Sequence, residues 1–163
     1  MKTYNTDKTV SIENLVQTCS DYRASAKSVV WTNGCFDVLH VGHVHLLSEA
    51  SRLGDILVVG LNSDDSVRRL KGDGRPYYSF RDRARVLSAI AVVDYIIELD
   101  DDLPCSAIEQ LKPEVCCKGS DYAPPGGKPI PEAKVISSYG GRLRYVQLLE
   151  GYSTSSILEQ NNL

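Results

Sequence analysis

The chain has 163 residues, a net charge of −3, 42% hydrophobic residues and 24% charged residues, which fits one globular domain with a sizeable core. The acidic balance argues against a general nucleic-acid binder, because such proteins carry a basic face. No apolar run approaches the roughly 20 residues that span a bilayer, and residues 1–10 lack the apolar segment of a signal peptide. We therefore expect a cytoplasmic protein that binds neither nucleic acid nor membranes, and the odd number of cysteines fits a reducing compartment.

Predicted helices and strands alternate along the chain. In chain order we expect a helix at 12–23 with Ser11 as its N-cap, a strand at 28–32, a helix at 43–52, a strand at 55–62, a helix at 64–70, a loop at 71–76, a helix at 79–91, a strand at 95–99, a helix at 103–111, a strand at 115–118, a helix at 130–139, a strand at 143–148 and a helix at 153–160. The strands are apolar on both faces, so helices must cover both sides of the sheet. This pattern predicts a doubly wound, parallel, five-stranded α/β sheet. We treat residues 1–163 as one domain, with 1–26 as an N-terminal helical extension and 27–163 as the core.

Doubly wound sheets bind ligands beyond the carboxyl ends of their strands. The stretch T-N-G-C-F-D-V-L-H-V-G-H, residues 32–43, follows the first predicted strand. Asn62, Lys118 and the turn at 151–155 follow later strands or end them. We expect these segments to converge on one edge of the sheet.

The H-V-G-H element at that edge predicts an anion site. His43 begins the predicted helix, where free backbone N–H groups favour an anion, and His40 lies on the preceding turn. Gly42 removes a side chain from between them, and Gly34 lets the backbone approach a ligand closely. Two imidazole donors over a helix N-terminus suit a polyphosphate whose charge grows during reaction. The alternative is one capping histidine and one surface histidine.

Three cationic residues could add to such a site. Lys71 and Arg75 flank G-D-G in a predicted loop, where they either close over a phosphate or remain solvated. Lys118 ends a predicted strand, and a buried lysine is costly without a partner, so we expect a phosphate or Asp121 beside it. A metal site made by the two histidines and Asp37 is a poor chelate, and magnesium held partly by substrate phosphates is favoured.

Two signatures carry a resemblance to a known family. T-N-G-C-F-D-V-L-H-V-G-H-V-H-L-L (32–47) and Y-S-T-S-S-I (152–157) resemble the signatures of the cytidylyltransferase-like nucleotidyltransferases. V-V-G-L-N-S-D-D-S-V-R-R-L-K-G-D-G-R-P (58–76), the helix of Arg83 and C-C-K-G-S-D-Y (116–122) are similar to bacterial D-glycero-β-D-manno-heptose 1-phosphate adenylyltransferases. The resemblance covers nearly the whole chain. It implies a Rossmann-like fold and transfer of AMP from ATP to a sugar 1-phosphate, a heptose 1-phosphate in this branch, with release of pyrophosphate.

The resemblance and the patterns above together assign residues to the site. Catalytic roles fall to His40, His43, Lys71 and Arg83. Nucleotide binding falls to Thr32, Asn33, Gly34, Phe36, Gly42, Lys118, Ser153, Thr154 and Ser155. Substrate binding falls to Asp37, Asn62, Asp64, Arg75 and Asp121, with a structural role left open for Asp37 and a capping role left open for Ser63 or Asp64. The implied cofactor is Mg²⁺ held through the phosphates of ATP, the implied partners are ATP and a sugar phosphate, and the apolar helix faces would permit a homodimer.

Two alternative functions remain open at this point. One is a cytidylyltransferase for an alditol or amino-alcohol phosphate such as glycerol 3-phosphate, although that branch usually has a lysine where this chain has His45. The other is a nucleotide-binding module without turnover, against which the two histidines and the second signature argue. The segment A-P-P-G-G-K-P-I-P, residues 123–131, is longer and richer in proline than this branch leads us to expect, so it could reshape the acceptor pocket.

Overall fold

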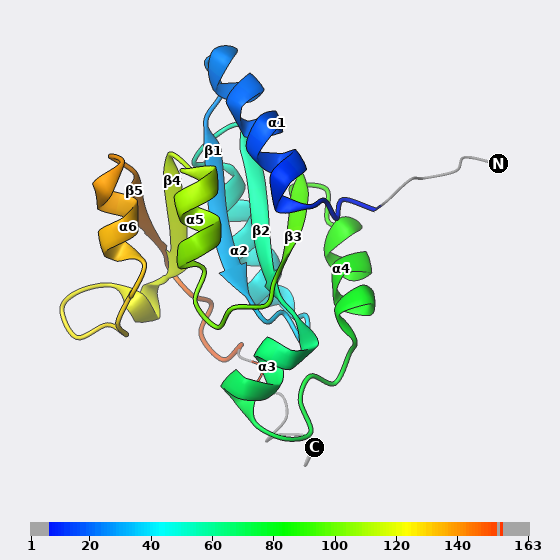
Figure 1. Ribbon diagram of the computed structural model, residues 1–163. Coiled ribbons are helices and arrows are strands. Elements are labelled where there is room, and N and C mark those ends of the chain that lie inside the picture. Colours follow the sequence, from blue (N-terminus) through cyan, green and yellow to red (C-terminus); the bar gives the residue numbers. More distant parts are fainter. Residues whose placement is uncertain (1–6, 153, 155–163) are drawn as a thin grey trace.

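A single parallel sheet organises the chain. The computed structural model describes residues 7–152 and residue 154, and its strands lie in the order β3-β2-β1-β4-β5 (Figure 1). The strands are β1 (Val29–Gly34), β2 (Ile56–Asn62), β3 (Tyr95–Leu99), β4 (Val115–Gly119) and β5 (Arg142–Val146). All neighbouring strands pair in parallel. The strand order reverses between β1 and β4, whose carboxyl ends we call the switch point, so the predicted doubly wound, Rossmann-like α/β fold is confirmed.

Helices cover both faces of this sheet. They are α1 (Ile12–Ala24), α2 (Val41–Ser51), α3 (Asp64–Lys71), α4 (Phe80–Ser88), α5 (Cys105–Leu111), the 3₁₀ helix η1 (Ser120–Tyr122) and α6 (Ala133–Ser138). Apolar residues of α2 and α4 pack on one face. Those of α1, α5 and α6 pack on the other, and α1 and α5 lie in front of the sheet in Figure 1. None of the helices in the described part of the chain combines the length and the apolar character needed to cross a bilayer.

The helix starts follow local capping chemistry. The hydroxyls of Ser11, Ser63 and Ser79 accept backbone N–H groups of the first turns of α1, α3 and α4. The helix predicted at 43–52 begins earlier, at Val41, because His40 itself acts as the cap. The helices predicted at 79–91 and 130–139 are shorter in the structure, and the helix predicted at 153–160 lies outside the described residues apart from Thr154.

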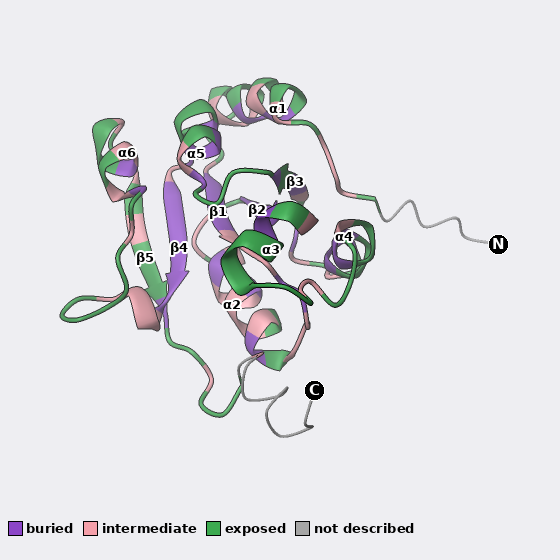
Figure 2. Cartoon of the chain, turned by 60° about the horizontal axis from the view of Figure 1, so that its bottom comes forward, coloured by how far each residue is buried: buried purple, intermediate pink, exposed green. Residues whose placement is uncertain are grey.

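The two central strands form the middle of the core. Every residue of β2 is buried, and alternate residues of β1 face opposite clusters, Val30 on one side and Trp31 on the other. A Cβ at Gly60 would lie 2.5 Å from the Trp31 ring, so the glycine leaves room for the indole to cross β2. Figure 2 shows β4 buried and β5 largely exposed. The arginines of β5 suit an edge strand, where charge discourages pairing with other chains.

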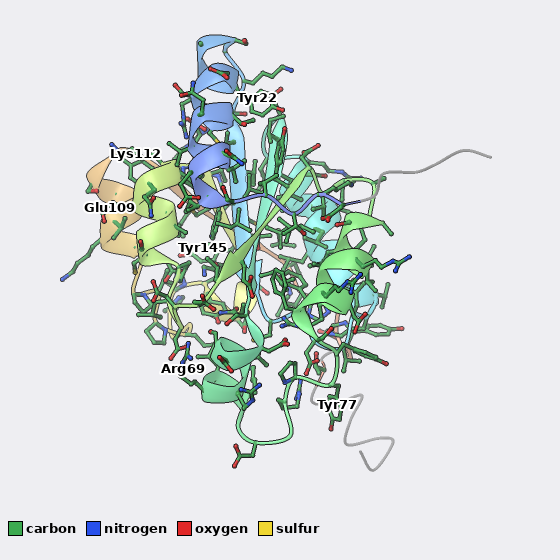
Figure 3. All side chains as sticks on the ribbon, turned by 45° about the vertical axis from the view of Figure 1, so that its right-hand side comes forward. Tyr22, Arg69, Tyr77, Glu109, Lys112 and Tyr145 are labelled. Carbon is green, nitrogen blue, oxygen red and sulfur yellow. The ribbon has the colours of Figure 1, made fainter. Side chains whose placement is uncertain are left out.

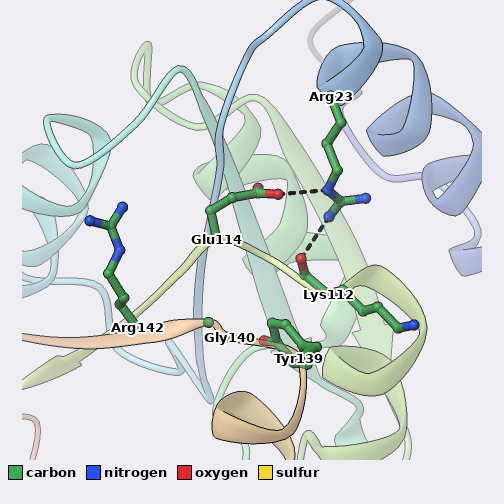
Figure 4. Close-up of a pocket in the computed structure, with 7 residues that line it drawn as sticks. Arg23, Lys112, Glu114, Tyr139, Gly140 and Arg142 are labelled. Carbon is green, nitrogen blue, oxygen red and sulfur yellow. Dashed lines mark hydrogen bonds and ion pairs between the residues drawn. The ribbon is translucent and has the colours of Figure 1, made fainter.

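The N-terminal segment is fastened to the amino ends of the strands. Arg23 of α1 forms an ion pair with Glu114, whose Nε and Oε1 atoms lie 2.6 Å apart (Figure 4). The second carboxylate oxygen of Glu114 accepts the backbone N–H of Val29 at 2.8 Å. Leu15 and Cys19 are buried in the same cluster as the sheet. The helix α1 therefore shares the core formed by residues 27–152.

Candidate active site

Two stacked histidines stand at the start of α2, beyond the carboxyl end of β1. The centroids of the His40 and His43 rings lie 3.9 Å apart, with 33° between the ring planes. Nδ1 of His40 accepts the backbone N–H of Gly42 at 3.1 Å, and Nδ1 of His43 accepts the backbone N–H of His40 at 3.4 Å. The pair thus forms a reciprocal cap in which each ring satisfies one free donor of the helix end.

This cap fixes the state of both imidazoles. A ring nitrogen that accepts a hydrogen bond carries no proton, so Nε2 of each ring holds the N–H. Burial, and to a lesser extent the neighbouring His40 ring, lowers the pKa of His43 to about 4. Burial also lowers the pKa of His40. Near neutral pH the site therefore presents two neutral Nε2–H donors, on the side of each ring opposite the helix cap.

Small residues and an aromatic ring shape the space around these donors. A Cβ at Gly42 would lie 2.9 Å from the His40 ring and 3.2 Å from the backbone oxygen of Tyr152. The start of the second signature therefore lies against the N-terminus of α2, as we expected from the topology. The Phe36 ring packs 5.1 Å from the His43 ring, and a Cβ at Gly34 would meet the Phe36 ring at 3.3 Å. Phe36 holds a left-handed backbone (φ +45°), a conformation that is costly for a bulky residue and is typical of functional sites.

Arg83 has a different place from the predicted one. Its side chain is 1% exposed, and its guanidinium donates to the carbonyls of Cys35, Asn62 and Tyr78 at 2.6, 2.9 and 3.0 Å. It also donates to the carboxylate of Asp64 at 2.8 Å. The arginine is therefore a buried clamp that joins the ends of β1 and β2 to α3, because the last carbonyls of these strands need donors. We correct its predicted catalytic role to a positioning role.

Asp37 and Arg75 bind each other. The Asp37 carboxylate is 1% exposed and lies 2.5 Å from Nε of Arg75. It also accepts the backbone N–H groups of Tyr77 and Tyr78 at 2.7 and 3.2 Å. Tyr77 lies at the lower edge of the molecule in Figure 3, near the turn that follows α3. These contacts fit the structural role that the sequence left open for Asp37, since a buried carboxylate attracts the nearest cation and free N–H groups. Substrate binding by Arg75 stays a prediction. Lys71 ends α3 and is exposed.

Asn62 and Asp64 also serve the fold. Ser63 caps α3, which is the alternative that the sequence left open for this segment. The Asn62 amide donates to Ser66 at 3.0 Å, and Asp64 holds Arg83. These residues set the end of β2, and their substrate contacts stay predictions. Arg69 of α3, labelled in Figure 3, donates to Asp102 at 2.8 Å and ties the helix to the loop after β3.

Lys118 reaches the site from β4. Its Nζ donates to Oδ1 of Asn33 at 2.9 Å, across the switch point. Its carboxylate partner is Glu132, just before α6, and not the expected Asp121. The sequence indicates that a buried lysine needs an anion, but it does not indicate which of several acids supplies it. Glu132 is thus a buried site residue that the sequence analysis missed.

Asp121 belongs to the base of the 123–131 segment. Its carboxylate pairs with Lys128 at 2.5 Å, and its carbonyl accepts the backbone N–H of Lys128 at 2.9 Å. Lys128 also lies 5.3 Å from the centre of the Tyr122 ring. These contacts close the segment into a loop that extends from the sheet beside η1 (Figure 1). Asp121 therefore anchors this loop, and its substrate contact stays a prediction.

The remaining residues of the two signatures lie in three settings. Thr32 is 1% exposed within β1, so its side chain belongs to the interior, and the nucleotide contact expected of its backbone stays a prediction. Ser153 and Ser155 lie outside the described residues, and Thr154 is half-buried. Nε2 of His45 lies 3.0 Å from the carbonyl of Gln147, so this ring bridges α2 to the segment after β5.

A cavity of about 430 Å³ lies at the opposite edge of the sheet. Figure 4 shows its lining, which comes from the end of α1 and the turns before β4 and β5. Arg23 spans it between Glu114 and the carbonyl of Lys112. Ligands of doubly wound sheets bind at the carboxyl edge, so the histidine pair and not this cavity marks the candidate site.

Comparison with known proteins agrees with this geometry. The family model described as cytidylyltransferase-like matches residues 31–159. The bifunctional protein HldE of Syntrophotalea carbinolica is 48% identical over 85% of this chain and 28% of its own length. The HldE protein of Geobacter metallireducens is 45% identical over 94% of this chain and 31% of its own length. The chain thus spans less than a third of these relatives.

Solved structures share the fold. A lipopolysaccharide core biosynthesis protein from Thermoplasma volcanium superposes with a TM-score of 0.60 at 28% identity, covering 78% of this chain and 99% of that protein. Pantoate-beta-alanine ligase from Francisella tularensis gives a TM-score of 0.62 at 13% identity, covering 95% and 72%, and is similar in fold alone. With the matched family model spanning most of the chain, and the histidine pair and switch point in the geometry described, this protein belongs to the cytidylyltransferase-like family.

Proposed function

We propose that this chain transfers AMP from ATP to a sugar 1-phosphate, which its motifs indicate to be a heptose 1-phosphate. The observation that carries the proposal is the capped pair of His40 and His43, with two neutral N–H donors over the N-terminus of α2. K-G-D-x-R-P at 71–76 and K-G-x-D-Y at 118–122 support the heptose branch. The likeness to HldE proteins and to a lipopolysaccharide core biosynthesis protein supports the same substrate class.

The proposed reaction is a direct displacement. A phosphate oxygen of the sugar 1-phosphate attacks the α-phosphorus of ATP, the bond from that phosphorus to the β-phosphate oxygen breaks, and pyrophosphate leaves. The attacking phosphate is already anionic near neutral pH, so no general base is required. Catalysis is then positioning and stabilisation of negative charge. The Nε2–H groups of His40 and His43 donate to triphosphate oxygens, whose charge increases as pyrophosphate departs.

Magnesium fits this proposal as a partner of the nucleotide. Mg²⁺ prefers oxygen ligands, whereas the donors nearest the site are imidazole nitrogens whose Nδ1 atoms already accept helix N–H groups. The buried carboxylate of Asp37 is engaged by Arg75 and two backbone N–H groups. We propose that the triphosphate oxygens bind Mg²⁺, which neutralises phosphate charge when bound.

A coupled pyrophosphate-release assay tests the proposal. The panel pairs ATP, CTP, GTP and UTP with D-glycero-D-manno-heptose 1-phosphate as each anomer, glucose 1-phosphate, glycerol 3-phosphate and phosphocholine, all with Mg²⁺. We expect release with ATP and one heptose 1-phosphate anomer, and mass spectrometry should detect the ADP-sugar in equal amount to pyrophosphate.

Two other outcomes would contradict the proposal in different ways. Release with CTP and glycerol 3-phosphate alone would make the chain an alditol-phosphate cytidylyltransferase. Nucleotide binding without release on any pair would make it a non-catalytic binding module. The contact of His45 with Gln147 disfavours the cytidylyltransferase, because that ring is engaged by the backbone at the position where that branch has a lysine.

A further inference from the structure

A buried pair of opposite charges lies at the switch point. Lys118 ends β4 and Glu132 precedes α6, and their side chains are 9% and 2% exposed. The ammonium forms an ion pair with Oε1 of Glu132, yet within the described residues this buried oxygen receives no aligned hydrogen bond. Buried ion pairs contribute little to stability unless their geometry is very good. The carboxylate neutralises the buried ammonium, and the further contacts of the ammonium show what the pair holds in place.

The pair acts on β1 across the switch point. Nζ of Lys118 donates to Oδ1 of Asn33 at 2.9 Å. Nε1 of Trp31 donates to the same oxygen at 3.2 Å. Two donors fix the oxygen end of the amide on their side, so its nitrogen end is turned to the other side. Glu132 therefore holds the Lys118 ammonium in place, and this ammonium in turn holds the Asn33 amide.

The position of these contacts, which run from Glu132 through Lys118 to Asn33, indicates their function. Ligands of doubly wound sheets bind where the strand order reverses, which is between β1 and β4 here. We infer that Glu132 is a positioning residue for nucleotide binding, because it holds Lys118 and thereby orients the Asn33 amide toward the bound nucleotide. This inference rests on the proposed function, since it takes the switch point to be the nucleotide site. Orientation of a binding group affects ground-state affinity, so it should act on the KM for ATP and not on kcat.

Glu132→Gln is the direct test, because it keeps the size of the side chain and removes the charge. Calorimetric titration with MgATP should give a Kd raised about 10- to 100-fold, the range for a lost hydrogen bond to a charged group. The KM for ATP should rise with it while kcat stays close to the wild-type value. Glu109→Gln, on the exposed side of α5 (Figure 3), is the matched control and should bind MgATP as the wild type does. A loss of kcat or of thermal stability with an unchanged KM for ATP would make Glu132 merely structural and overturn the inference.

A second substitution tests whether Glu132 acts through Lys118. In a Lys118→Met background, Glu132→Gln should weaken MgATP binding no further, because the intermediary is already gone. The double variant carries no buried charge, so its comparison with Lys118→Met serves the test even where Glu132→Gln alone does not fold. It should bind MgATP at least about tenfold more weakly than the wild type. Wild-type affinity in the double variant, or a full effect of Glu132→Gln without Lys118, would overturn the inference.

Calorimetry reports binding without turnover, so the two proposals fail separately. A wild-type chain that binds MgATP and transfers no AMP would contradict the proposed function, and the Glu132 series would still decide the positioning role. An active wild type whose MgATP affinity is insensitive to Glu132→Gln would contradict the positioning role alone.

Discussion

Single atoms decide what the two histidines can offer a ligand. Each ring has two nitrogens, and in both His40 and His43 one of them accepts a backbone N–H at the start of α2. The nitrogen that remains is a donor, and its proton cannot move to the other nitrogen without breaking the cap. The capping role and the anion-binding role, which the sequence presented as alternatives, are thus compatible in one ring.

The His43→Ala variant tests the donor directly. If the Nε2–H contributes a hydrogen bond to a triphosphate oxygen in the transition state, kcat/KM for AMP transfer should fall about 10²- to 10³-fold. Steady-state pyrophosphate release measures this ratio. His45→Ala is the matched control, because His45 lies on the same helix and bonds only to the carbonyl of Gln147 among the described residues, and it should retain activity within a few-fold. Equal losses in the two variants would contradict the assignment of His43.

The lowered pKa of His43 predicts a pH dependence of stability. The pKa is about 4 in the folded chain and 6.5 in a free imidazole, so between these values the unfolded chain binds more protons. The contribution is therefore complete above pH 6.5 and is lost as the pH falls to 4. Because a tenfold change in a proton-binding constant corresponds to about 1.4 kcal/mol, His43 accounts for a loss of up to about 3 kcal/mol. Urea denaturation from about pH 4 to 8 should show a shallower slope of stability against pH for His43→Gln than for the wild type, and identical slopes would contradict the burial of this imidazole.

At the scale of elements, the His40 ring and the Tyr152 carbonyl can approach the N-terminus of α2 because Gly42 has no side chain. Gly42→Ala places a Cβ against the His40 ring and the Tyr152 carbonyl, at 2.9 and 3.2 Å. The displaced His40 ring loses its hydrogen bond from the Gly42 N–H, which offsets the gain of about 1 kcal/mol in helix propensity. Stability should therefore stay close to the wild-type value while kcat/KM falls by about tenfold or more through misplacement of reacting groups. Val44→Ala on the exposed side of the same helix is the control. Unchanged activity in Gly42→Ala would show that the close approach has no catalytic consequence.

The Arg83 clamp joins four segments and should therefore carry stability. Arg83→Lys keeps the charge but cannot reach all four acceptors, and a buried acceptor left without a donor costs about 1–3 kcal/mol. We expect a loss of at least about 2 kcal/mol in the free energy of unfolding. Arg85→Lys, exposed on the same helix, should change it by less than about 0.5 kcal/mol. Wild-type stability together with lost catalysis would instead return Arg83 to the catalytic role predicted from sequence.

At the scale of the whole molecule, a bound nucleotide should stabilise every element that meets at the switch point. A ligand at about 100 times its Kd adds about 2.7 kcal/mol to the free energy of unfolding. For a chain of this size that is roughly 5–10 °C in melting temperature. A thermal-shift screen with ATP, CTP, GTP and UTP plus Mg²⁺ should give this shift with ATP and smaller shifts with the others. A larger shift with CTP would contradict the proposed donor.

The fold could be predicted from the sequence because the signals for its helices and strands are repeated and local. Apolar runs at 55–62 and 95–99 are too short for helices and too apolar for exposed strands, so burial in a parallel sheet is the arrangement that fits both. Ser11, Ser63 and Ser79 mark helix starts by chemistry that needs no tertiary partner. Helix ends at 88 and 138 were less predictable, because packing and not propensity decides where the last turn stops.

Only part of the site could be predicted from the sequence, because several of its contacts join residues far apart in the chain. The histidines are three residues apart, and their cap follows from helix geometry. Asp37 and Arg75 are separated by 38 positions. The residues around Arg75 therefore do not indicate that the arginine pairs with a buried carboxylate and not with a phosphate. Likewise Lys118 has a choice of acids, and only the position of α6 selects Glu132.

The position of β1 between β2 and β4 also has a consequence for synthesis on the ribosome. The strand ends at residue 34, β2 begins at 56 and β4 begins only at 115. At about 5–20 residues per second, roughly 4–16 s of translation separate the emergence of β1 from that of β4. During that interval one border of β1 carries unpaired N–H and C=O groups that a strand of another nascent chain can match. Pairing of this border with another nascent chain is therefore the route to aggregation that the strand order predicts.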